Sequence, residues 1–403
     1  MIFAHALLAA IPVFTHLSLQ DAQTRAVAQD VDVQIARATV RQRDAALEIA
    51  RSGGVPHLTG NYALAPQAGP FDRNIVEQHM FTVAAGVSIN DIVAASAQTR
   101  SATNDLLAAQ RNAEAATLKA REKAVRLYFG ALQSIALQAS REDSLRASRR
   151  DRDVAAIRVR NGASPRLDVV RADVTVAQAQ AELARAKADR ENAVEALASA
   201  TATAVASLDD LSGSQAANPS PPSEEQAVTR ALLSRPEVGA LLASIQARDS
   251  DVATAQMAGW PVATASGGYA AGVDSGQSVH GPAASVTLDI PLAPTTGARV
   301  SAAYAQFEVA RVQLLDVRRT IALEAASAVR EIHAEDESLS AASRAREEAV
   351  RAAAGVEIGY REGASSSLDV ADARRTATQA SIDALVAEYL RAQSYALLEI
   401  IAP

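Results

Sequence analysis

The chain has 403 residues, of which 49% are apolar but only 3% aromatic, and its formal net charge is −7. This length allows two or three domains or one elongated repeat protein. The acidic balance offers no basic footprint for nucleic acid, so no nucleic-acid partner is expected. The absence of cysteine excludes disulfides, thiolate metal sites and cysteine nucleophiles.

The N-terminal stretch MIFAHALLAAIPVF has the length of the apolar part of an export signal. No Lys or Arg precedes it, and no clear Ala-x-Ala cleavage site follows it. Residues 1–16 are therefore expected to be either a signal remnant or a short buried segment, and the two alternatives fit the pattern equally.

Residues 17–210 are predicted to form a first structural repeat. Its expected elements, in chain order, are a helix at about 18–51, a β-hairpin at 55–90, a long helix at 94–160, a tip turn at 161–166 and a return helix at 166–205. Residues 94–160 contain one glycine, Gly130, and no proline, which predicts a helix about 100 Å long at roughly 1.5 Å per residue. Its seven-residue apolar spacing indicates packing on partner helices, as shown by Leu106, Ala113, Ala120 and Leu127.

Residues 211–222 are predicted to be a Pro/Ser-rich linker to a second repeat at 223–403. The second repeat is expected to contain a helix at 223–257, a β-hairpin at 261–291, a long helix at 298–360, a tip turn at 361–367 and a return helix at 367–400. The duplication rests on two similar segments, NGASPRLDV at 161–169 and EGASSSLDV at 362–370, and on AQTRA (22–26) and AVTRA (227–231).

The predicted hairpins have strands with two different faces. Their second strands alternate, with Phe81, Val83, Ala85, Val87 and Ile89 opposite Thr82, Gly86, Ser88 and Asn90, and with Val286, Leu288 and Ile290 opposite Ser285, Thr287 and Asp289. Such strands suit a membrane β-barrel, although a soluble sheet with one wet face is the commoner alternative. Four strands cannot close a barrel, and lipid tolerates no open sheet edge, so several copies would have to share one barrel.

The repeated Gly-Ala-Ser segment predicts the tip of a helical hairpin. Gly162 and Gly363 each follow a long helix, where the chain needs positive φ. Ser164 followed by Pro165 is predicted to be an N-cap followed by proline at the first helical position, and Ser365 is expected to cap the second copy.

Over essentially its whole length the chain resembles the TolC-type outer-membrane efflux proteins. The duplicated half, the hairpin between a short and a long helix, and the tip pattern R-x-G-A-S-x-x-L-D-V carry the resemblance. It implies a mainly α fold with a small β part, in which four strands per chain contribute to a trimeric 12-stranded outer-membrane β-barrel that continues into a long α-helical periplasmic barrel. It also implies a homotrimer in the outer membrane of a Gram-negative bacterium, in contact with its lipid, that docks to a periplasmic adaptor and through it to an inner-membrane transporter.

The resemblance also implies site residues. The expected adaptor-docking tips are Gly162, Ala163 and Ser164 with Gly363, Ala364 and Ser365, and the expected periplasmic gate is Asp369, Asp372, Asp168, Tyr360 and Arg361. The first repeat departs from the pattern, because Val159 and Arg171 stand where the second has Tyr360 and Asp372.

The aspartates also have a local explanation. Asp168 and Asp369 lie near helix starts, where the helix dipole favours a carboxylate without any pore. Threefold symmetry would instead gather carboxylates around one axis and favour the passage of cations.

The expected function is a passive outer-membrane channel of a tripartite efflux pump or a type I secretion system. The histidines show no metal-ligand spacing, and neither a phosphate-binding loop nor a GxSxG motif is present, so neither an enzyme nor a cofactor is expected. A soluble coiled-coil scaffold is the main alternative. A periplasmic adaptor fits less well, because no β-rich block of the lipoyl type interrupts the helices.

Overall fold

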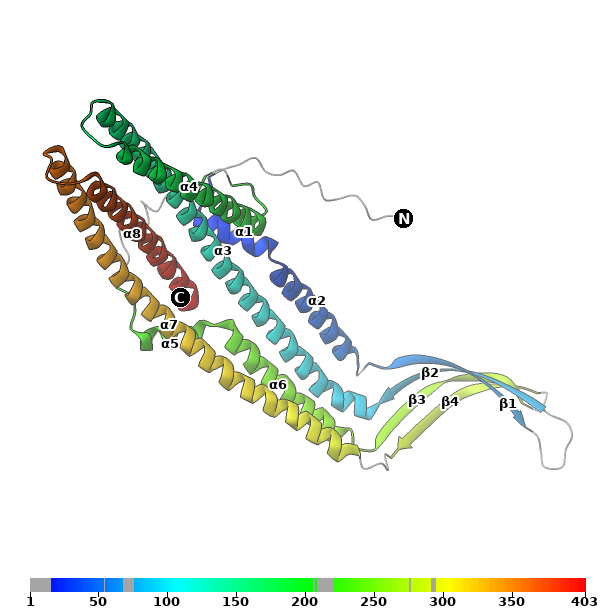
Figure 1. Cartoon of the computed structure of the whole chain (residues 1–403). Coiled ribbons are helices and arrows are strands. Elements are labelled where there is room, and N and C mark those ends of the chain that lie inside the picture. The colour runs from blue at the N-terminus through cyan, green and yellow to red at the C-terminus, as the bar shows by residue number, and fades with distance from the viewer. Residues whose placement is uncertain are drawn as a thin grey trace. The chain divides into compact units, whose positions relative to one another are not determined.

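The computed structural model describes residues 16–53, 55–67, 76–205, 207–208, 220–274, 277–290 and 295–403 (Figure 1). The N-terminal segment and most of the expected linker lie outside these residues. The helices are α1 (Leu19–Gln29), α2 (Val31–Ser52), α3 (Ile89–Arg160), α4 (Arg166–Thr201), α5 (Glu224–Ser234), α6 (Pro236–Met257), α7 (Thr295–Arg361) and α8 (Ser367–Ile401). The strands are β1 (His57–Gln67), β2 (Val76–Ser88), β3 (Val262–Asp274) and β4 (Gln277–Asp289).

The fold class expected from the sequence is confirmed, with a β-hairpin and a very long helix in each half. The chain divides into two compact units. The first unit takes in the residues up to Gln34 with Ala115–Arg235 and Arg319–Pro403, and the second unit takes in Ile35–Glu114 and Pro236–Arg318. Among the described helices, none combines the length and the hydropathy that a membrane span requires.

The opening helix of each half is broken, so the expectation of single helices at 18–51 and 223–257 is wrong. Asp30 leaves α1 in an extended conformation, and its carboxylate accepts hydrogen bonds from the backbone N–H groups of Asp32 (2.9 Å) and Val33 (3.3 Å) at the start of α2. In the second half Arg235 precedes Pro236, and the residue before a proline avoids the helical region. Both halves therefore contain 11-residue and 22-residue helices in succession.

The two break residues make equivalent ion pairs with reversed charge. Asp30 lies 3.7 Å from Lys123 on α3, whereas Arg235 lies 2.7 Å from Glu324 on α7 and 3.5 Å from Glu122 on α3. Lys123 and Glu324 stand the same number of residues before the tip glycines of their halves. The duplication has thus kept the site of the ion pair while exchanging its charges. The side chain of Arg235 is only 4% exposed, so this guanidinium is buried between the two carboxylates that it contacts.

The apolar core of the first unit is built from α1, α3, α4 and α8. Tyr128 and Phe129 of α3 pack edge to face with ring centroids 5.9 Å apart, and the Tyr128 hydroxyl donates to the Leu17 carbonyl at 3.2 Å. Leu197 of α4 and Leu397 of α8 complete this core. The remaining buried positions on these helices are mostly alanine, which allows close approach of the helix axes.

In the second unit, polar contacts join α3 to α6. The Ser101 hydroxyl donates to Asp251 at 2.6 Å, and Arg248 lies 3.1 Å from Asp105. Arg43 of α2 approaches the same Asp105 at 3.5 Å. Residues from both sequence halves therefore pack together in this unit.

The four strands form one antiparallel sheet in the order β1-β2-β3-β4 (Figure 1). The pairing of β2 with β3 joins the two hairpins, with Val83 opposite Tyr269. Gly268 permits this pairing, because a Cβ there would lie 2.0 Å from the Val83 carbonyl oxygen. Ile89 and Asn90, which the alternation had placed in the strand, instead begin α3.

The register gives the sheet two chemically different faces. Opposed residues across the strands share a face, so one face is apolar and includes Leu58, Tyr62, Phe81, Val83, Tyr269, Val286 and Leu288. The other face is small and polar and includes Thr59, Asn61, Thr82, Ser88, Thr264, Ser266, Ser285 and Thr287. The apolar face is uncovered by the described helices, since Leu58 is 74% and Val286 is 81% exposed.

Arg235 provides a test of the broken opening helix. We expect Arg235→Ala to lower the free energy of unfolding by about 2 kcal/mol, because it removes a buried guanidinium that pairs with Glu122 and with the half-exposed Glu324. Urea unfolding of the purified protein measures the change. Arg330→Ala removes an exposed pair with Glu224 and should change the stability by less than about 0.5 kcal/mol. Equal losses in the two variants would contradict a structural role for the buried pair.

Candidate functional site

Each long helix ends in the same turn. Gly162 has φ 73° and Gly363 has φ 80°, values that glycine adopts without strain. At the first turn the Gly162 N–H donates to the Val159 carbonyl (3.1 Å) and the Ala163 N–H to the Arg158 carbonyl (2.9 Å). The second turn repeats this pattern at Gly363 and Ala364. Both are Schellman motifs, which satisfy the last carbonyls of a helix and reverse the chain.

The N-caps of the return helices lie one residue later than the sequence predicted. Pro165 occupies the N-cap position of α4, with φ −69° and ψ 151°, and caps no backbone N–H with a side chain. Ser366, rather than Ser365, caps α8. The Schellman turns include Ala163 and Ala364, so Ser164 and Ser365 directly follow the turns. The return helices begin only two residues after these serines.

Asp369 closes a capping box with Ser366. The Ser366 hydroxyl accepts the Asp369 N–H at 3.2 Å, and the Asp369 carboxylate accepts the Ser366 N–H at 2.8 Å. Hydrogen bonds from the Ser366 backbone and hydroxyl lower the pKa of Asp369. The lowered pKa keeps this carboxylate ionised at neutral pH, and the side chain is exposed to solvent.

Asp168 has a different partner, which lies on the other hairpin. The hydroxyl of Ser367 at the start of α8 donates to the Asp168 carboxylate at 2.8 Å. The two residues are 199 positions apart in the chain, yet both belong to the first unit. This hydrogen bond joins the α3/α4 and α7/α8 hairpins at their tips.

Tyr360 makes a second link between the hairpins. The guanidinium carbon of Arg158 on α3 lies 4.0 Å from the centroid of the Tyr360 ring on α7. A cation over an aromatic face is attracted by the ring quadrupole. Sequence reasoning missed Arg158, and the only available signal was that Arg158 and Gly359 occupy equivalent places in the two repeats, which does not predict a contact.

Arg361 belongs to a charged network behind the tip. Arg361 binds Glu357 at 2.7 Å, and Arg374 of α8 contacts both Glu357 (3.0 Å) and Asp151 of α3. The Arg361 and Arg374 guanidinium groups lower the pKa of Glu357. Sequence reasoning missed Asp151, Glu357 and Arg374, which tie α3, α7 and α8 together.

The predicted gate residues therefore do not form one cluster. Asp168 and Tyr360 lie at contacts between the hairpins, and Arg361 lies in the network behind them. Asp369 caps its own helix, and Asp372 is exposed with Arg375 at 3.1 Å on the same helix.

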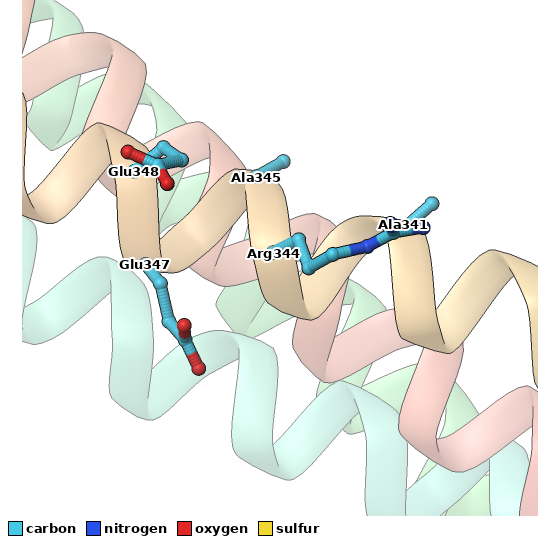
Figure 2. A pocket seen from close by; sticks show the side chains of 5 residues that line it. All are labelled: Ala341, Arg344, Ala345, Glu347 and Glu348. Carbon is cyan, nitrogen blue, oxygen red and sulfur yellow. The ribbon is translucent and has the colours of Figure 1, made fainter.

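One surface hollow of the described residues lies on α7. Figure 2 shows a shallow hollow whose lining comes from α7 alone, namely Ala341, Arg344, Ala345, Glu347 and Glu348. One helix cannot surround a ligand. Within the described ranges, no group of three or more His, Asp or Glu residues could hold a metal ion.

The tip glycines can be tested directly. We expect Gly162→Ala and Gly363→Ala each to lower the free energy of unfolding by about 1 kcal/mol, because a Cβ is strained at positive φ. Gly355→Ala is the matched control, since a Cβ there meets nothing within 4 Å and the helix interior favours alanine. Urea unfolding should show the control unchanged or stabilised, and a control that behaves like the tip variants would contradict the assignment.

The capping box predicts a pH dependence. Because folding lowers the pKa of Asp369, its contribution to stability is complete above the unfolded pKa, near pH 4, and is lost as pH falls through the folded pKa. Thermal unfolding of the wild type and Asp369→Asn from pH 7 to pH 2 should show a difference that disappears in acid. A difference that grows in acid would contradict this sign.

Comparison with solved structures identifies the fold. CusC is 15% identical to this chain, with 97% of this chain and 95% of that chain covered and a TM-score of 0.82. OprN is 19% identical, with coverages of 95% and 89% and a TM-score of 0.82. MtrE of Neisseria gonorrhoeae, solved in its open state, is 21% identical, with coverages of 95% and 88% and a TM-score of 0.76. No curated protein matches the chain.

The model of the family described as outer membrane efflux protein matches residues 22–203 and 227–401, which are most of each sequence half. These matches span both helical hairpins and the strands between the helices. The chain belongs to the outer membrane efflux protein family, a family of outer-membrane channels rather than a class of enzymes.

Proposed function

We propose that three copies of this chain form the outer-membrane duct of a tripartite efflux pump or a type I secretion system. In this proposal the duct is passive, and a periplasmic adaptor connects it to an inner-membrane transporter that supplies the energy. Small molecules or proteins would leave the cell through the duct. The choice of cargo would belong to the adaptor and the transporter.

The four-stranded sheet is the observation that carries this proposal. Among the strands that the structure describes, the outer ones, β1 and β4, each have one edge without a partner. Hydrocarbon tolerates no open edge, and the smallest single-chain barrels have about eight strands. Three copies of a four-stranded sheet would supply enough strands to close. The apolar face would then contact lipid, and the face rich in Ser and Thr would line the water-filled interior.

The soluble scaffold is not favoured, because it gives the apolar face nothing to contact. A soluble sheet buries one face against its own helices, whereas here Tyr62 is 61% and Leu288 is 60% exposed. The two-faced sheet therefore supports the channel.

At the hairpin tips we propose a gate and a docking surface. Asp369 and Asp372 are the proposed gate carboxylates, and their exposure on α8 supports this role. The contacts of Asp168, Tyr360 and Arg361 would stabilise the arrangement of the helices around the channel entrance, because they connect α3, α7 and α8. The Gly-Ala-Ser turns would meet the adaptor, since the glycine and the alanine of each turn are exposed.

The proposed duct is tested by reconstitution. Purified protein should sediment as a trimer in detergent and should form conducting pores in planar lipid bilayers. A monomer that stays in water without detergent would exclude the duct.

The proposed gate is tested by its charges. Asp369→Ala together with Asp372→Ala should raise the single-channel conductance and lower the cation selectivity, because a ring of carboxylates narrows the mouth and attracts cations. Ser366→Ala is the matched control, since it removes the hydroxyl that caps the Asp369 N–H and keeps both charges. Unchanged conductance and selectivity in the double variant, or the same change in the control, would remove the gate assignment.

A further inference from the structure

The two hairpin tips carry opposite charge. We define the first tip as residues 158–171 and the second tip as residues 359–372, which occupy equivalent positions in the two repeats. The first tip contains four arginines and one aspartate, a formal charge of +3. The second tip contains one arginine, one glutamate and two aspartates, a formal charge of −2.

The positive charge of the first tip is available at its surface. Arg160, Arg166 and Arg171 are exposed, and none of them makes an ion pair with any described residue. Arg158 lies over the Tyr360 ring, a contact that leaves its charge in place. Three guanidinium groups thus remain open to a partner.

The second tip presents carboxylates instead. Glu362 is exposed and has no ion-pair partner among the described residues, and Asp369 is held in its ionised form by its capping box. The one arginine of this tip, Arg361, is already bound by Glu357. The two tips therefore differ in the charge that they offer, although their Schellman turns have the same backbone hydrogen bonds.

We propose that the two tips dock oppositely charged surfaces of one periplasmic protein. The first tip would take a segment that carries Glu or Asp, and the second tip would take a segment that carries Lys or Arg. This inference rests on the proposed function, in which the tips are docking sites. Like charges across an interface lower the affinity, and opposite charges raise the rate of association. The opposite charges of the two tips would therefore decide which segment of the partner binds to which tip.

The adjacency of the tips favours a protein over a membrane surface. Ser367 and Asp168 are hydrogen-bonded across the two tips at 2.8 Å, and Arg158 and Tyr360 are in contact. A flat anionic lipid surface that attracted the first tip would therefore be repelled by the second tip beside it. A protein can place carboxylates and ammonium groups a few ångströms apart, which a uniform headgroup layer cannot do.

The experiment uses the full-length protein in detergent and two fluorescent helical-hairpin peptides. The peptides are identical except that one carries Glu and the other Lys around its turn, and binding is followed by anisotropy at low and high salt. The first-tip swap is Asn161→Glu, Arg166→Ser and Arg171→Asp, which introduces the residue types of the second tip. This swap should lower the affinity for the Glu peptide by about tenfold and raise the affinity for the Lys peptide. Both changes should be smaller at high salt.

The second-tip swap is Glu362→Asn with Asp372→Arg, and it should lower the affinity for the Lys peptide. The matched control is Arg185→Ser, Arg190→Asp and Asn192→Glu, which makes the same substitutions at exposed positions on α4 outside the tip. The control should bind both peptides as the wild type does.

The inference would be overturned if the first-tip swap left the affinity for the Glu peptide unchanged, or if the α4 control lost as much affinity as the swap. It would also be overturned if anionic vesicles bound as tightly as the Glu peptide. The same preparations are examined in planar bilayers. Wild-type pores together with charge-blind peptide binding would overturn this inference alone, whereas a wild type without pores would overturn the proposed function itself.

Discussion

The unpaired edges of the four-stranded sheet are the constraint on which the rest of the molecule depends. A backbone N–H or C=O without a partner is unfavourable in hydrocarbon, so a sheet with two free edges has no stable place there as a single copy. Water offers no better place, because the face with Leu58 and Val286 is apolar and uncovered. The sheet of one chain is therefore suited to be part of a larger β-barrel, and family membership places that barrel in the outer membrane.

Gene duplication supplied two versions of one helical hairpin, which have since diverged in charge. The ion pair Asp30–Lys123 and its counterpart Arg235–Glu324 occupy the same place with exchanged signs. The tips show a similar divergence, with arginines in one and carboxylates in the other. Backbone geometry was retained in both cases, since the breaks and the glycine turns are the same. A channel built from such chains would present six tips of two kinds.

Local patterns predicted much of this fold from the sequence. Tip glycines are recognisable because positive φ excludes most other residues, and the strand faces follow from a period of two. Local patterns failed where one residue decides the geometry. The N-caps of the return helices lie one residue later than predicted, at Pro165 and Ser366, and the break at Asp30 carries no Pro or Gly signal.

By itself the sequence determined the duplication, the long helices, the turn glycines and the two-faced strands, because each depends on residues that are near one another in the chain. Only the tertiary structure decided the pairing of β2 with β3, the Ser367–Asp168 hydrogen bond and the stacking of Arg158 on Tyr360. These contacts join residues that are well over a hundred positions apart, and helical or strand periodicity holds no information about which distant side chain completes a contact. Their geometry depends on how the helices pack.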